Sequence, residues 1–227
     1  MQPPASARTV TVGVDRLARW MDGFAQRHGT TGPALVDDAV LLTGADGSRA
    51  WIEIPFEPLV DGGPLVDGDP SADGGPVTDG ADLLDRLVAH ARRERVVAVL
   101  LVRRGGHAAG LFDGARLTAS KVGSSYVQGT TKAGGWSQQR YARRRANQAS
   151  AAFADAADAA VRVLGDARPE ALVAGGDRDA VRAVLADRRL AHLPAPSGPW
   201  LTVKDPKLKV LAATPEQFRA VRIRLDP

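Results

Sequence analysis

The segment with the clearest chemical potential is a glycine-rich loop that leads into a helix. Gly134 and Gly135 are followed, three residues after the second glycine, by Gln138 and Gln139. Adjacent glycines let a loop tip adopt positive φ and let its backbone approach a partner closely. A glutamine amide is a neutral donor and acceptor, so it can orient a water molecule without bringing a charge. These residues predict a slim, uncharged tip that positions water.

The helix behind this tip is basic at its front end. The pattern predicts a loop over Ser124–Ser137 and one helix over Gln138–Leu164, about 40 Å long at 1.5 Å per residue. Residues 114–154 hold no acid and seven basic residues, which are Arg116, Lys121, Lys132, Arg140, Arg143, Arg144 and Arg145. Arginines at a helix N-terminus oppose the helix dipole, by about 0.3–1 kcal/mol per group. A bound phosphate backbone would reverse that penalty, and a merely solvated basic face is the alternative.

The remaining pattern predicts the elements that must hold the loop. Alternation favours a hairpin of Ala39–Thr43 and Arg49–Phe56. Further strands are expected at 95–103, 108–112, 115–121, 170–174 and 208–213, and helices at 14–28, 81–94, 178–190 and 215–224. Hairpin strands come first and alternate with helices later, which predicts an α/β fold with a mixed β-sheet flanked by helices. We expect one domain over 1–227, with a flexible Gly/Pro/Asp-rich loop at 57–80 and a mobile catalytic loop at 124–137.

Composition narrows the chemistry. The chain has 227 residues, a formal net charge of +4 and no cysteine, which removes thiolate chemistry and disulfides. No apolar run approaches the length of a membrane span and no signal peptide is visible, so we expect a cytoplasmic protein. The four histidines have no metal-ligand spacing, so no metal or cofactor is expected. His107 is expected at the surface, and Asp177 as the cap of the helix that follows it.

At the loop the sequence resembles the Vms-like release factors, relatives of the class I eukaryotic and archaeal peptide-chain release factors. The looser G-x-x-Q of that branch fits Gly135–Gln138, with Lys132 just upstream. Ser125–Val127 and Leu172–Asp177 also resemble that catalytic domain. Two residues separate the glycine pair from the glutamine, so this is not a strict GGQ. Gln138 and Gln139 both remain candidates, and the spacing favours Gln138.

The resemblance implies a peptidyl-tRNA hydrolase that frees nascent chains from tRNA. No codon-reading domain is apparent, so rescue of stalled large ribosomal subunits is the expected setting. Implied catalytic residues are Gln138, Gly135, Gly134 and Gln139; implied RNA-binding residues are Lys132, Arg140, Arg143, Arg144, Arg145 and Lys121. The expected partners are large-subunit rRNA and peptidyl-tRNA, with no membrane and a monomeric chain. Two alternatives stay open: an endonuclease that cuts tRNA near its CCA end, and a non-catalytic ribosome- or RNA-binding module.

Overall fold

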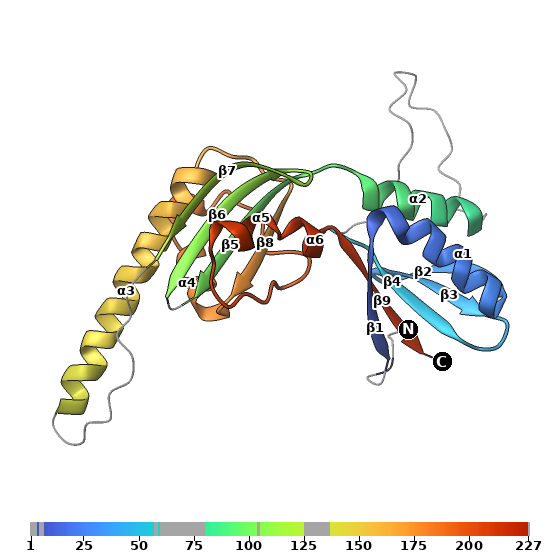
Figure 1. Cartoon of the computed structure of the whole chain (residues 1–227), viewed down its shortest axis with the longest axis horizontal. Coiled ribbons are helices and arrows are strands. Elements are labelled where there is room, and N and C mark those ends of the chain that lie inside the picture. Colours follow the sequence, from blue (N-terminus) through green and yellow to red (C-terminus); the bar gives the residue numbers. More distant parts are fainter. Residues whose placement is uncertain are drawn as a thin grey trace. The chain divides into compact units, whose positions relative to one another are not determined.

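The computed structural model divides the chain into two compact units, each with its own sheet (Figure 1). Unit 1 comprises Met1–Arg93 with Arg219–Pro227, and unit 2 comprises Glu94–Phe218. The sequence analysis predicted one domain over this length. The structure describes residues 4, 7–56, 59, 80–103, 105–124 and 137–226, without the side chains of 30, 31, 137–147 and 149. The predicted loops at 57–80 and 124–137 lie outside these residues except at 59, 80, 124 and 137.

Unit 1 is an antiparallel sheet with two helices on one face. Its strand order is β1-β9-β4-β3-β2. The strands are β1 (Arg8–Gly13), β2 (Thr30–Val36), β3 (Ala39–Gly44), β4 (Arg49–Glu53) and β9 (Ala220–Asp226), and the helices are α1 (Leu17–His28), entered through a short 3-10 turn at Val14–Arg16, and α2 (Gly80–Arg92). Apolar residues of both helices, such as Phe24 and Leu87, form one buried core with Val40 and Ile52 of the sheet.

The predicted hairpin of unit 1 is confirmed. β3 pairs with β4 in antiparallel register, from Ala39 opposite Glu53 to Thr43 opposite Arg49. The turn between them is closed by Asp46, whose carboxylate accepts a hydrogen bond from the Ser48 backbone N–H at 2.9 Å and lies 2.8 Å from Nδ1 of His28. These two hydrogen bonds, with that of His28 the larger, lower the pKa of Asp46 to about 2. A short polar turn therefore fixes the register that the alternation predicted.

Two C-terminal predictions were wrong. Residues 208–213 were expected as a strand but form the short helix α5 (Leu208–Ala212), which buries Leu211 and leaves Leu208 52% exposed. The helix expected over Pro215–Arg224 ends at Phe218 as α6 (Pro215–Phe218), and β9 follows it. In β9 Val221 and Ile223 are buried while Arg222 is exposed, which is the two-residue period of a strand. β9 lies between β1 and β4, so its partners are distant in sequence.

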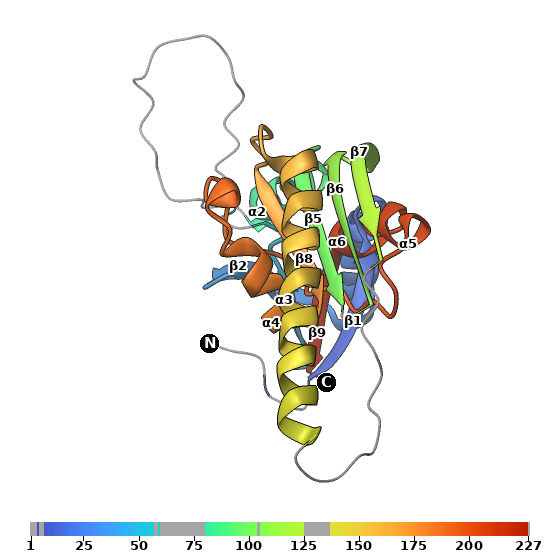
Figure 2. The same cartoon turned by 90° about the vertical axis from the view of Figure 1, so that its left-hand side faces the viewer.

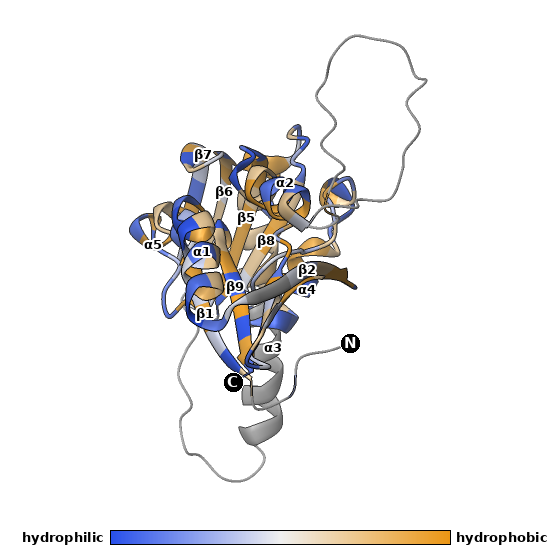
Figure 3. Ribbon diagram, turned by 90° about the vertical axis from the view of Figure 1, so that its right-hand side faces the viewer, coloured by the Kyte–Doolittle hydropathy of each residue, from blue (hydrophilic) through white to orange (hydrophobic). Residues whose placement is uncertain are grey.

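Unit 2 is the mixed sheet that the sequence predicted, with strand order β7-β6-β5-β8. Its strands are β5 (Val96–Arg103), β6 (Gly106–Asp113), β7 (Arg116–Gly123) and β8 (Ala171–Gly176). β5 runs parallel to β8 and antiparallel to β6. β5 is apolar throughout its centre and buried on both faces, as expected for a strand covered on two sides (Figure 3).

Helices cover both faces of this sheet (Figure 2). One face carries the long α3 (Ser137–Leu164) and α4 (Arg178–Leu185), whose apolar residues share a core with Ala109 of β6 and Leu100 of β5. A short 3-10 turn, Arg188–Leu190, follows α4. The other face carries α5 and α6: the ring of Phe218 meets that of Phe112 edge-on at 5.6 Å. Neighbouring β6 residues thus point to opposite layers.

Candidate functional site

The structure fixes both ends of the candidate loop. β7 ends at Gly123 and α3 begins at Ser137, which confirms the predicted long helix and its start. Gly134, Gly135 and Lys132 lie outside the described residues. Gln138 and Gln139 fall in the first turn of α3, and the predicted arginines follow them on the same helix; these are Arg140, Arg143, Arg144 and Arg145. Their side chains are not described, so their roles remain predictions.

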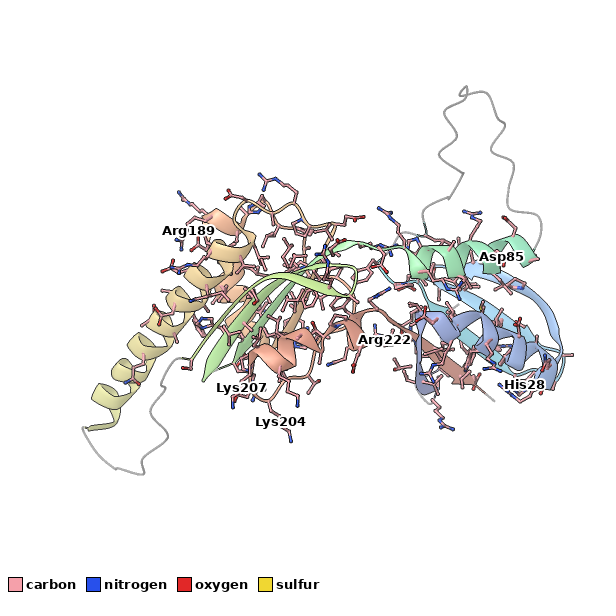
Figure 4. The ribbon with its side chains drawn as sticks, turned by 45° about the horizontal axis from the view of Figure 1, so that its top comes forward. His28, Asp85, Arg189, Lys204, Lys207 and Arg222 are labelled. Atoms are coloured by element: carbon pink, nitrogen blue, oxygen red, sulfur yellow. The ribbon has the colours of Figure 1, made fainter. Side chains whose placement is uncertain are left out.

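The second half of α3 holds the helix on unit 2. Ala156, Ala160 and Leu164 are buried against the sheet at three- and four-residue spacing, which confirms the predicted apolar stripe there. Beyond that stripe, Asp158 accepts a hydrogen bond from Nη2 of Arg189 at 2.7 Å (Arg189 is labelled in Figure 4). Arg189 also binds Asp187 at 2.6 Å. The acid at position 158 is therefore engaged near the C-terminal end of the helix, away from residues 140–145.

The base of the loop is packed tightly around a histidine. A Cβ on Gly123, the last residue of β7, would lie 2.3 Å from Nε2 of His107, which is opposite it on β6. Only glycine leaves room for this ring. His107 was expected at the surface, but it is 6% exposed. His107 belongs to a strand whose alternate residues face α3. Its burial could not be predicted from the sequence, because a histidine that follows two glycines is typical of an exposed turn.

Burial decides the protonation of His107. Desolvation lowers its pKa below the usual value of 6.5, Asp155 on α3 raises it, and Lys121 on β7 lowers it. The histidine is therefore neutral near pH 7. Lys121 itself is exposed, and its register partner Ala109 belongs to the core beneath α3. Of the predicted RNA-binding side chains, Lys121 is the one that the structure describes, and it lies three residues before Ser124, where the loop begins.

The Gly175–Asp177 turn at the end of β8 is closed by its own groups. Asp177 caps α4, as predicted, by accepting from the backbone N–H groups of Asp179 and Ala180 at 3.1 and 3.3 Å. Gly176 has a φ of 90°, and a Cβ there would lie 2.2 Å from the Val102 carbonyl oxygen. The Asp177 carboxylate occupies the N–H groups that would otherwise attract a phosphate.

Two further observations bear on the chemistry. Within the described residues no group of three or more histidine, aspartate or glutamate side chains is placed to hold a metal ion. In the same part of the chain, no helix combines the length and apolar character that a membrane span needs.

The chain belongs to the actinobacteria/chloroflexi VLRF1 release factor family, because the model of that family matches residues 95–224, more than half of the chain. The match begins with unit 2 and contains the loop and all of α3. It confirms the resemblance to release factors seen in the sequence. No curated protein matches the chain.

Two solved archaeal structures are similar to this chain. One is the crystal structure of the archaeal translation termination factor aRF1, with 16% identity and a TM-score of 0.38 over 91% of this chain and 56% of that one. The other is an archaeal protein with 16% identity and a TM-score of 0.32, over 78% of this chain and 52% of that one. The chain spans about half the length of these two proteins.

Proposed function

We propose that this protein is a peptidyl-tRNA hydrolase that releases nascent chains from tRNA on stalled large ribosomal subunits. The observation that supports the proposal most is the placement of the G-x-x-Q segment within a release-factor family match. Gln138 falls in the first turn of a helix whose later turns pack on unit 2. Such a helix can carry a loop away from the body of the domain.

The proposed reaction is attack of water on the ester that joins the peptide to the terminal adenosine of tRNA. Gly134 and Gly135 keep the tip slim, and Gln138 holds the water or stabilises the developing oxyanion. Aminoacyl esters are already activated, so a neutral amide suffices. In a cavity lined by RNA, a carboxylate base would be repelled by phosphates. Arg140, Arg143 and Arg144 contact phosphates and set how far the loop enters.

Peptide release from purified large subunits that carry peptidyl-tRNA tests the proposal. We expect Gln138→Ala to lower the rate constant of release by about 10²–10³-fold, the size of effect seen when an oxyanion donor is removed. Gln148→Ala is the matched control, because it removes the same amide from the same helix ten residues further on. It should release peptide at the wild-type rate.

The products separate this proposal from its alternatives. Free peptide with full-length tRNA supports ester hydrolysis, whereas tRNA shortened at its CCA end supports a nuclease. Binding without any product supports an anchoring module. If Gln138→Ala and Gln139→Ala both release peptide at the wild-type rate, the catalytic assignment is wrong.

A further inference from the structure

Lysine is rare in this chain and is confined to two segments. Of the 30 basic residues, 25 are arginines and five are lysines. The lysines are Lys121, Lys132, Lys204, Lys207 and Lys209. The first two belong to the end of β7 and the candidate loop. The other three fall within six residues of each other, some 70 positions later, a segment to which no motif points.

The fold brings the second lysine segment to the end of the sheet from which the loop departs. A Cβ on Gly106, the first residue of β6, would lie 3.1 Å from the carbonyl oxygen of Gly123 and 3.5 Å from Cγ of Pro206. Pro206 lies between Lys204 and Lys207. The lysine segment therefore borders the end of β7, and Figure 4 shows both labelled lysines at the margin of unit 2 near that strand end.

Lys121 and the second lysine segment lie on opposite faces of the sheet. Leu211 of α5 packs over Gly110 of β6, so the chain that follows Lys207 runs along that face. Lys121 pairs with Ala109, which faces the α3 layer. Since neighbouring strand residues point to opposite sides, cations border the loop exit from both faces.

The surface formed by Lys204, Lys207 and Lys209 is positively charged and accessible to a binding partner. Lys204, Lys207 and Lys209 are exposed, and among the described residues neither Lys204 nor Lys209 has an ion-pair partner. Lys207 lies 2.9 Å from Asp205, which is the one acid between residues 188 and 215, and both side chains are more than half exposed. An exposed pair of this kind is weak because water screens both charges, so a phosphate can replace the carboxylate. Lysine binds phosphate as a compact point charge.

We propose that Lys204, Lys207 and Lys209 form a second contact with ribosomal RNA phosphates, on the face of the unit 2 sheet opposite α3. The proposal rests on the proposed function. Ribosomal RNA fits better than tRNA, because the substrate tRNA meets the protein at the loop tip. The wall of a cavity that encloses the sheet end would present phosphates to both of its faces at once.

Binding of the full-length protein to vacant large subunits at several salt concentrations tests the contact. The variant Lys204→Gln/Lys207→Gln/Lys209→Gln removes three charges from the surface. Arg162→Gln/Arg168→Gln/Arg182→Gln removes three exposed charges elsewhere on unit 2 and serves as the matched control. We expect the lysine variant to lower the slope of log affinity against log salt by about 2, since each phosphate contact contributes roughly 0.7–0.9. Replacement of the three lysines by arginine should retain the slope.

The outcomes are separable from those of the release assay. The lysine contact is overturned if the lysine variant keeps the wild-type salt slope, or if the arginine control lowers the slope by as much. Either result counts whether or not the wild-type protein releases peptide. A loss of affinity for free tRNA but not for vacant subunits also overturns it. Conversely, a lysine-specific fall in slope with no peptide release by any protein upholds the contact while the proposed hydrolase activity fails.

Discussion

The two halves of α3 are built for different surroundings. Residues 149–164 bury Ala156, Ala160 and Leu164 against a sheet and engage Asp158 with an arginine of the same unit. Residues 137–148 contain four arginines and no acid. The dipole of a helix disfavours that order of charge. The contrast teaches that the second half serves the fold, whereas the charge order of the first half is what the proposed contact with RNA would favour.

Leu164→Ala should give the largest effect on the folding side of this comparison. Leu164 is the last residue of α3, and its side chain is fully buried. Truncation of such a side chain costs about 2–5 kcal/mol of unfolding free energy, through lost transfer energy and the cavity left behind. Arg144→Gln, on the first half of α3, should change the unfolding free energy by less than about 0.5 kcal/mol. Urea unfolding followed by circular dichroism measures both, and equal losses would erase the distinction between the halves.

Sequence patterns predicted the part of the fold in which neighbouring residues determine structure. Alternation and a polar turn predicted the hairpin of β3 and β4. An alanine-rich apolar stripe predicted the long helix α3. β9 was misread because Pro215 suggested a helix start, although the alternation from Val221 to Leu225 carried the strand period. Its partners β1 and β4 are more than 160 residues away in sequence. Only the assembled sheet shows that a strand is needed there.

β2 was not predicted at all, because Gly32 and Pro33 interrupt its pattern. Proline is tolerated on an edge strand, where no neighbour needs its N–H, and β2 is such an edge. At the candidate site, the helix start and the family could be predicted from local residues. The burial of His107 and the approach of Pro206, which lies between two lysines, to the end of β7 could not, since both depend on the tertiary fold.

Gly123→Ala tests the junction between the sheet and the loop. Its expected effect on the unfolding free energy is the next largest. The added methyl group would meet the buried ring of His107 at 2.3 Å. Overpacking of this kind costs about 1–3 kcal/mol. The double variant Gly123→Ala/His107→Ala should lose less than the sum of the two single changes, because the clash is gone. Additive losses in urea unfolding would show that His107 does not constrain Gly123.

Arg140→Gln/Arg143→Gln/Arg144→Gln should separate binding from stability on the first half of α3. We expect affinity for large subunits to fall about tenfold and the salt slope to flatten by roughly 2–3. Unfolding free energy should stay the same or rise slightly, because the variant removes unfavourable charge from a helix N-terminus. A loss of stability as large as that of Leu164→Ala would mean that these arginines serve the fold. Parallel binding titrations and urea unfolding measure both quantities.

The smallest effect concerns His107, beneath the second half of α3. Its pKa lies below 6.5 in the folded protein because burial disfavours the charged ring, with Lys121 acting in the same direction and Asp155 opposing. The unfolded chain therefore binds the proton first as the pH falls. Unfolding free energy should be highest above pH 6.5 and decline below it until the folded-state pKa is reached. His107→Gln should flatten this decline. If its pH profile in urea unfolding matches that of the wild-type protein, the packing of the β6–β7 end beneath α3 is looser than described, and the anchored half of the helix loses one of its supports.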